Sequence, residues 1–483
     1  MRGFLRRVSY LSAANLVNGI LGVVFVPVAV HRLGPEGYGI FSIYGVLVGY
    51  VVLVELGLGK NLVRVLAGMP DDEERRHQLQ LAWGLYLTVA GTLVLLAPLA
   101  AWLVPALLFP VEPARQTAVA WIAVLAIADY VMAVPVSLRQ NRCIADEQFD
   151  RYSRYVVASG LLRYGVGFAA VFAFASPVPV VAALALRRLG DVGLAGWLMG
   201  PLPAGSWRPR FERRAFARMV GHSSALSLAQ LLQITVVSVG SILVNYVFGL
   251  RALGVYRAVF DLVSKVWFFS NVVGSVVFPR FVRLLAGAAG RERLAGLLPS
   301  VLQASWLGFS LFAVGGIVVG PWVLARIGLA GPEYVGLFLT LMVGASFNAH
   351  TNLASEFLQA TGRYTVVVGL AALSLAALLG GFFALSGATG LLAIGWAWLA
   401  SQLAYGLAAD ATVLRALAAL RVVGAREVLA RGLGAGAVML CVAGGLGTGR
   451  GYWLAGAVAG VAATLLTARD LRRVRAQWLP AHP

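Results

Sequence analysis

Charged residues interrupt several apolar stretches of this sequence, where they can bind ions or anionic groups. In ALALRRLGDVG (183–193), Arg187 and Asp191 are four residues apart, so they share one helical face and can form an ion pair. Arg188 is rotated by about 100° from Arg187 around such a helix, and we predict that it has no partner within that helix. The alternatives for Arg188 are an ion pair with Asp129, in another apolar stretch, or a side chain that reaches the membrane surface.

A second charged group lies in YRAVFDLVSKVWFF. Arg257, Asp261 and Lys265 follow one another at intervals of four residues, which predicts that they stack on one face of a helix. One reading is a structural ladder in which the charges neutralise one another. The alternative interpretation is that two cations exceed the single anion, which leaves positive charge available to bind a ligand.

Arg163, in LLRYG, stands near the middle of a further apolar stretch, again with Asp129 as an alternative partner. A charge at the centre of a bilayer costs at least about 2.5–3.5 kcal/mol, so such residues are functional candidates. We predict that four cations bind an anionic substrate: Arg163, Arg188, Arg257 and Lys265. Four residues are predicted to support them or to couple transport to an ion: Asp129, Arg187, Asp191 and Asp261.

The composition shows which elements must position these residues. Of 483 residues, 60% are hydrophobic and only 12% are charged, and many apolar runs reach the length of about 20 residues that crosses a bilayer as a helix. The sequence therefore predicts an all-α polytopic membrane protein. We expect about fourteen transmembrane helices, at these positions: 9–31, 38–59, 81–108, 116–138, 152–173, 176–199, 222–246, 252–278, 298–322, 335–358, 364–386, 389–412, 430–448 and 451–468.

The net charge of +19 is concentrated between these spans. When the N-terminus is placed in the cytoplasm, most arginines fall on the cytoplasmic side, as the positive-inside rule requires. This pattern predicts that both termini are cytoplasmic and that 176–199 crosses the membrane. The basic charge therefore reports topology and contact with anionic lipid, and no nucleic-acid partner is expected.

The sequence also repeats at an offset of 215 residues. Six pairs of positions match: Ser12 with Ser227, Asn15 with Gln230, Asn18 with Gln233, Gly34 with Gly249, Gly39 with Gly254, and Phe41 with Tyr256. The two copies have the same predicted orientation, which indicates a parallel repeat. We predict a six-helix lobe over 1–200, a cytoplasmic linker over 201–221, a second six-helix lobe over 222–417, and a terminal helix pair with a basic tail over 418–483.

Polar residues within the repeat form a stripe in each copy. They are Ser12, Asn15 and Asn18 in the first copy, and Ser227, Gln230 and Gln233 in the second. Such side chains often form hydrogen bonds between membrane helices. Because the stripe occurs in both copies, we favour the interpretation that it lines a water-filled cavity.

Other polar residues have simpler interpretations. His350 is able to titrate, but we favour the interpretation that it is simply hydrogen-bonded. Asp410 is interpreted as interfacial or ion-paired, with ion coupling as the alternative. The sequence contains no nucleotide-binding loop, nucleophile motif, zinc-ligand spacing or dinucleotide fingerprint. We therefore expect no enzymatic activity, no cofactor and no metal site.

The segment PVAVHRLGPEGYGIFSIYGVLVGYVVLVELGLGKNLVRVLAG (27–68) resembles the signature region of bacterial polysaccharide and O-antigen flippases, within the multidrug/oligosaccharidyl-lipid/polysaccharide exporter superfamily. The likeness rests on Pro27, on LGPE followed by Tyr38 and Gly39, and on Glu55 with the LGLG and LVR motifs. LRQNRCIADEQFDRYSR (138–154) and GLAGPEYVGLF (328–338) look like further loops of that family.

The resemblance implies two six-helix lobes around a positively lined cavity in the bacterial inner membrane. It implies the export, for surface polysaccharide synthesis, of an oligosaccharide linked to a polyprenyl pyrophosphate, with polymerase and glycosyltransferase partners. Arginine suits this substrate because a guanidinium binds phosphate through two hydrogen bonds. The alternative is an ion-coupled multidrug or small-cation exporter of the same fold. A polytopic glycosyltransferase or polymerase is disfavoured because no outer loop is long enough for a catalytic domain.

Overall fold

The computed structural model describes residues 2–53, 58–67, 69, 72–212, 224–267 and 313–419, with positions 270, 281, 298, 302, 305, 308 and 309 between the last two ranges. These residues form helices and connecting turns, with no strand among them. The chain divides into two compact units, residues 1–258 (the first unit) and 259–483 (the second unit). Each unit is considered separately below.

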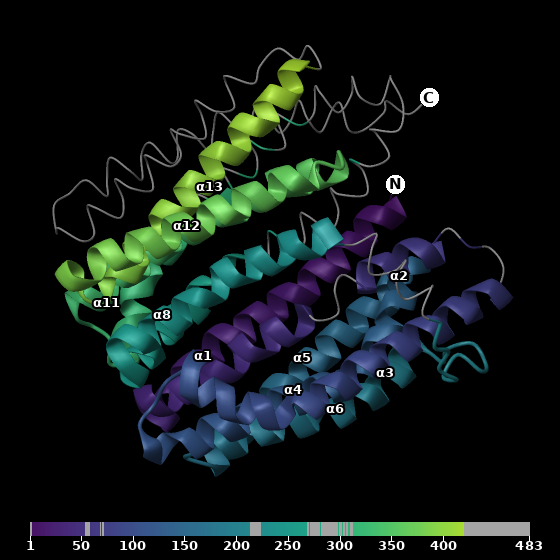
Figure 1. The fold of residues 1–483 in the computed structure, drawn as a ribbon, viewed down its shortest axis with the longest axis horizontal. Coiled ribbons are helices and arrows are strands. Elements are labelled where there is room, and N and C mark those ends of the chain that lie inside the picture. The colour runs from purple at the N-terminus through teal and green to yellow at the C-terminus, as the bar shows by residue number, and fades with distance from the viewer. Residues whose placement is uncertain are drawn as a thin grey trace. The chain divides into compact units, whose positions relative to one another are not determined.

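The first unit contains most of the labelled helices (Figure 1). They are α1 (Arg2–Leu53), α2 (Leu58–Ala67), α3 (Asp72–Leu103), the π-helical turn η1 (Val104–Leu108), α4 (Pro113–Ala145), α5 (Phe149–Ala173), α6 (Pro177–Met199) and α8 (Ser224–Val263), whose last turn belongs to the second unit. α4 packs against α1, α3 and α6, and α5 packs against α1 and α6. These contacts place the charged segments of α4, α5 and α6 in one bundle.

The second unit is described through α11 (Pro332–Ala360), α12 (Tyr364–Thr389) and α13 (Leu392–Ala419). α13 packs against both α11 and α12. α11 is buried along nearly its whole length, and its buried residues include Asn348, His350 and Ser355. A helix with polar groups buried on several sides must satisfy them through its neighbours.

Seven described segments are long and apolar enough to cross a membrane: Asn15–Val51, Asp72–Leu108, Pro113–Ala145, Phe149–Ala173, Leu228–Val263, Tyr364–Thr389 and Leu392–Val413. The all-helical membrane architecture is therefore confirmed. α6 has 23 residues and is about 35 Å long, a length that suffices for the predicted span at 176–199. The predicted terminal pair at 430–448 and 451–468 lies outside the described residues, and the predicted lobe and linker boundaries remain a prediction.

The predicted repeat is visible in the backbone. α1 and α8 each contain one break in helical geometry, at Gly34 (φ 70°, ψ 168°) and at Gly249 (φ 81°, ψ −179°). Positive φ favours glycine because it has no Cβ atom. The two breaks are separated by the offset of 215 residues found in the sequence. Each break divides one long helix into two of the predicted spans, so this part of the repeat is confirmed.

A second matched pair of glycines permits close contact between α1 and α8 within the first unit. A Cβ atom at Gly39 would lie 2.6 Å from the carbonyl oxygen of Leu250, and one at Gly254 would lie 1.7 Å from that of Pro35. Pro35 and Leu250 are themselves equivalent in the repeat. Gly39 of α1 therefore faces Leu250 of α8, and Gly254 of α8 faces Pro35 of α1. This reciprocal arrangement is expected when two helices cross about an approximate two-fold axis.

We expect the substitution Gly254→Ala to destabilise the protein. The added methyl group would meet backbone atoms, so α1 and α8 would have to separate, and overpacking of this kind costs about 1–3 kcal/mol. The melting temperature of the purified full-length protein measures the effect. Gly165→Ala in α5 is the matched control, because a Cβ atom there meets nothing within 4 Å. Equal melting temperatures for the two variants would contradict the proposed close contact.

Candidate functional site

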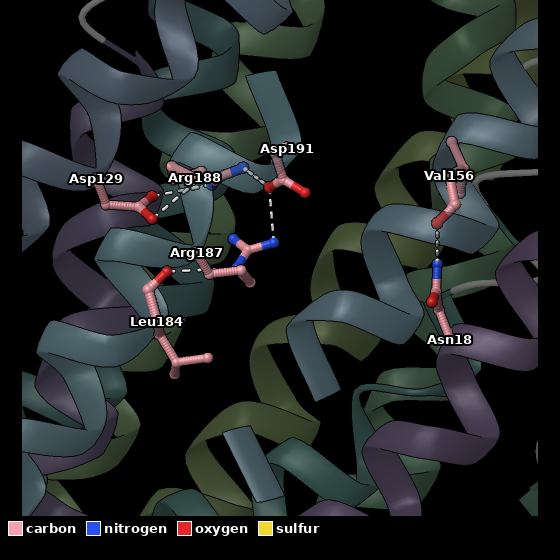
Figure 2. Close-up of polar contacts among 7 residues, drawn as sticks. All are labelled: Asn18, Asp129, Val156, Leu184, Arg187, Arg188 and Asp191. Carbon is pink, nitrogen blue, oxygen red and sulfur yellow. Dashed lines mark hydrogen bonds and ion pairs between the residues drawn. The ribbon is translucent and has the colours of Figure 1, made fainter. Parts of the chain in front are cut away.

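Four charged side chains meet inside the first unit (Figure 2). Asp129 comes from α4, and Arg187, Arg188 and Asp191 come from α6. We refer to these four residues as the charged cluster. α4 and α6 pack against each other, so an acidic residue on one helix and basic residues on the other become neighbours although they are far apart in sequence.

Arg187 forms the pair that its spacing predicts. Its Nη1 atom donates to Oδ2 of Asp191 at 2.7 Å, and its Nε atom donates to the carbonyl oxygen of Leu184 at 3.3 Å. Both partners are almost fully buried, with side-chain exposures of 4% for Arg187 and 0% for Asp191. The predicted pair of Arg187 with Asp191 is therefore confirmed.

Arg188 is held by two carboxylates. Its Nε and Nη2 atoms each donate to one oxygen of Asp129, both at 2.9 Å, and its Nη1 atom lies 3.4 Å from Oδ2 of Asp191. The prediction that Arg188 has no partner within its own helix was wrong. Residues three apart are also neighbours on a helix surface, and the arginine side chain is long enough to reach Asp191. The alternative pairing with Asp129 is confirmed.

The charges of the cluster balance, since it contains two arginines and two aspartates. Asp191 shares Oδ2 between both arginines, while its Oδ1 is buried and has no hydrogen-bond partner among the described residues. Two tyrosines border the cluster: Tyr44 of α1 interacts with Asp129, and Tyr155 of α5 interacts with Asp191. Side chains from four helices, α1, α4, α5 and α6, therefore converge at this point.

Arg163 of α5 is the accessible cation beside this cluster. Its side chain is exposed, its guanidinium carbon lies 5.9 Å from the ring centroid of Tyr164, and it is near enough to Arg187 and Tyr44 to act on both electrostatically. No carboxylate in the described part of the chain forms an ion pair with it, and both oxygens of Asp129 are held by Arg188. Together, the cluster and Arg163 carry one net positive charge.

The predicted ladder of Arg257, Asp261 and Lys265 is only partly helical. Arg257 is half-buried in α8, and its Nη2 atom lies 4.0 Å from a Cβ atom placed on Gly45 of α1. The regular helix ends at Val263, and Lys265 stands in the turn that follows. The backbone N–H of Lys265 donates to the carbonyl of Leu262, three residues back.

This hydrogen bond spans three residues instead of four, so Lys265 lies beyond the regular helix, and the predicted stacking of Arg257, Asp261 and Lys265 remains a prediction. Asp261 and Lys265 belong to the second unit, whereas Arg257 belongs to the first.

The polar stripe is described in part. The Nδ2 atom of Asn18 donates to the carbonyl of Val156 on α5 at 3.3 Å, a contact between helices that Figure 2 also shows. A Cβ atom on Gly160 would overlap the Asn18 side chain, so this glycine makes room for the contact. Asn15, Gln230 and Gln233 are half-buried, and the side chains of Ser12 and Ser227 lie outside the described residues. The contact of Asn18 favours a role in helix packing, and the predicted cavity lining remains a prediction.

The structure also joins residues that sequence reasoning considered one at a time. In the second unit, Nε2 of His350 lies 3.1 Å and 3.2 Å from the two carboxylate oxygens of Asp410, and its Nδ1 lies 2.8 Å from Oγ of Ser305. His350 and Asp410 are 60 residues apart, so no local pattern could have paired them. Within the described ranges, no group of three or more His, Cys, Asp or Glu side chains is placed to hold a metal ion.

Comparison with solved structures identifies the fold. The lipid II flippase MurJ in an inward closed conformation matches with a TM-score of 0.67 at 11% identity, over 96% of this chain and 98% of that one. An inward-facing multidrug resistance MATE family transporter of the MOP superfamily matches with a TM-score of 0.58 at 14% identity, over 85% and 99%. A MATE crystal structure in complex with MaD3S has a TM-score of 0.61 at 13% identity, over 86% and 96%.

At these identities the matches establish the fold alone. No curated protein matches the sequence. The family model described as "Polysaccharide biosynthesis protein" matches residues 4–285, a range that contains the motif segment 27–68 and the whole charged cluster. Because this match covers more than half of the sequence and agrees with the resemblance of its motifs, the chain belongs to the polysaccharide biosynthesis protein family.

Proposed function

We propose that this protein is a flippase that moves an oligosaccharide linked to a polyprenyl pyrophosphate across the membrane for polysaccharide synthesis. The observation that carries the proposal is the placement of Arg163, an accessible cation beside a buried and charge-balanced cluster, within a family and fold of membrane transporters. A pyrophosphate is anionic and needs such a cation in an otherwise apolar bundle.

The four residues of the charged cluster have different parts in this proposal. Asp129 and Asp191 hold the guanidinium groups of Arg187 and Arg188 in fixed positions, so that little ordering is left to occur when substrate binds. Arg188 keeps a side-chain exposure of 23% and is the member of the cluster that can reach a ligand. Arg163 supplies the uncompensated charge, and Arg257 of α8 is proposed to add a further contact.

The alternative function, export of cationic drugs, receives support from the MATE structures that share the fold. A cation-binding site should carry net negative charge. The described charges of the first-unit site sum to a positive value, because Arg163, Arg187 and Arg188 outnumber Asp129 and Asp191. The charge of the site therefore favours an anionic substrate.

We propose further that the protein resides in the bacterial inner membrane with both termini in the cytoplasm, and that it has no catalytic activity of its own. The excess of arginine in the predicted cytoplasmic loops supports this topology. Glycosyltransferases that build the glycan and a polymerase that consumes it are the expected partners. The inside-negative potential would favour outward movement of the anionic head, by about 2.3 kcal/mol per charge per 100 mV.

Replacing Arg163 with alanine is expected to reduce polysaccharide export without reducing the amount of protein. Loss of one charge-assisted hydrogen bond costs about 1.5–3 kcal/mol, which corresponds to roughly a 10- to 100-fold weaker interaction. Surface polysaccharide would be measured in a deletion strain that carries the variant, with the level of the membrane protein determined in parallel.

The matched control is Arg154→Ala on the same helix. Arg154 is also exposed, but it pairs with Asp150 four residues before it. We expect this variant to export normally. Normal export by the Arg163→Ala protein at an unchanged protein level would contradict the proposed role of Arg163.

A further inference from the structure

Three buried polar side chains are linked by hydrogen bonds inside the second unit. His350 of α11 is fully buried and bonds Asp410 of α13 through Nε2, while its Nδ1 lies 2.8 Å from Oγ of Ser305. We call these three residues the His350 site. They come from three separate segments of the chain, so their hydrogen bonds connect elements that the backbone does not connect directly.

The hydrogen-bond distances of the site are compatible with either a neutral or a cationic His350. Oγ of Ser305 also lies 2.8 Å from the carbonyl of Leu302, and a hydroxyl group has only one hydrogen to donate. When Ser305 donates to Leu302, it must accept from Nδ1 of His350, so both imidazole nitrogens carry hydrogen and His350 is cationic. When the hydroxyl group turns and donates to Nδ1, His350 is neutral and still donates from Nε2 to Asp410.

Rotation of a single hydroxyl group would therefore satisfy the hydrogen bonds of the site both with and without one added proton. Proton uptake forms an N–H bond at Nδ1 and turns the Ser305 hydroxyl toward Leu302. The charge of the pair then rises by one unit, which is the charge of the added proton. Proton release reverses both steps, and no other reactant is needed.

The described helices around the site carry few charged or titratable residues. Between its ends, α12 carries no acidic or basic residue, and its one tyrosine, Tyr364, is its first residue. The segment after α8 reaches α11 through Ser270, which donates to the carbonyl of Ala349 at 2.9 Å. The other titratable or charged residues of the packed elements are Glu333, Tyr334 and Glu356 on α11, Tyr405 and Arg415 on α13, and Asp261 and Lys265 near the end of α8.

The charged cluster of the first unit contains no histidine. Asp129 and Asp191 are both bound by arginine, a side chain that donates hydrogen bonds and accepts none. Histidine is the side chain whose charge ordinarily changes between about pH 5 and pH 8. Asp410 keeps a side-chain exposure of 10% whereas His350 has none, so a proton would enter at the carboxylate end.

We propose that the His350 site binds a proton that couples transport to the proton gradient. This inference rests on the flippase function proposed above and assigns the coupling role to His350 and Asp410, in place of the earlier candidates Asp129 and Asp261. The two protonation states differ in charge and in hydrogen bonding between α11, α13 and the segment of Ser305. A proton bound there consequently changes the relative stability of the arrangements that these segments can adopt.

The test uses the full-length protein in phosphatidylglycerol-containing vesicles, with a fluorescently labelled polyprenyl pyrophosphate disaccharide as the probe. Movement of the probe between leaflets is measured with and without a gradient of one pH unit. For the unaltered protein, we expect the gradient to raise the rate by up to about tenfold, because one pH unit corresponds to about 1.4 kcal/mol. His350→Gln and Asp410→Asn are expected to move the probe at one rate under both conditions.

His31→Gln is the matched control, because His31 is an exposed histidine of α1 and its replacement should leave the gradient response intact. The melting temperature of each variant is recorded, and Asp410→Asn decides the matter if His350→Gln does not fold. A gradient response retained by Asp410→Asn would overturn the inference. If the unaltered protein moved the probe equally fast with and without a gradient, the coupling inference would be overturned but the proposed flippase function would stand. If the unaltered protein never moved the probe, the proposed function would be overturned as well.

Discussion

Replacing Asp191 with alanine is expected to destabilise the protein by about 3–5 kcal/mol, the cost of leaving a buried charge without its partner. Arg187 has a side-chain exposure of 4% and, among its described partners, would keep only the carbonyl of Leu184, while Arg188 would lose the second of its two carboxylates. The melting temperature of the purified protein and the fraction of folded protein in membranes measure the loss.

Asp150→Ala on α5 is the control for this prediction. Asp150 pairs with Arg154 at the same spacing of four residues, but both side chains are more than half exposed. Exposed pairs contribute only about 0–1 kcal/mol, so this variant should remain close to the unaltered protein. If Asp191→Ala and Asp150→Ala were equally stable, the charged cluster would not be buried from water as the structure describes.

The membrane class and the local ion pair were predictable because both depend on neighbouring residues. The apolar runs that predict helical spans and the spacing of Arg187 and Asp191 are local features of the sequence. The equivalence of the breaks at Gly34 and Gly249 could also be inferred, because the repeat pairs positions that are 215 residues apart. In each case the physical cause acts along one helix or recurs in a second copy.

The composition of the site was less predictable because it depends on which helices pack together. Arg188 and Asp129 are 59 residues apart, and His350 and Asp410 are 60 residues apart. The sequence identified all four as polar residues in apolar surroundings, and Asp129 was named as an alternative partner. Only the packing of α4 with α6 and of α11 with α13 determined which carboxylate each basic residue received.

The end of the regular helix just before Lys265 also has a local physical cause. A spacing of four residues predicts a shared face only while the helix continues, and the turn after Val263 ends that regularity. The hydroxyl group of Ser264 donates to the carbonyl of Asp261 at 2.9 Å, one of the local bonds by which serine competes with helical hydrogen bonding. The serine in DLVSKV was a signal for this end of the helix, although serine occurs within many membrane helices.

The pair of Asp129 and Arg188 allows its structural role to be separated from its role in binding. Asp129→Leu alone should destabilise the protein by about 3–5 kcal/mol, because Arg188 would lose both of its bonds at 2.9 Å. The double variant Asp129→Leu/Arg188→Met removes both charges and should recover most of that loss, since apolar replacement of a buried ion pair is often neutral or stabilising.

Polysaccharide export by the double variant should not recover when its stability recovers. If Arg188 reaches the pyrophosphate, the double variant will fold and still export at least about tenfold less polysaccharide, the effect of losing a charge-assisted contact of about 1.5–3 kcal/mol. Melting temperature and surface polysaccharide, measured on the same variants at matched protein levels, separate the two roles. Full export by a stable double variant would show that the bond between α4 and α6 serves folding alone, and the substrate contact would then have to come from Arg163, the cation that the structure leaves without a carboxylate among its described neighbours.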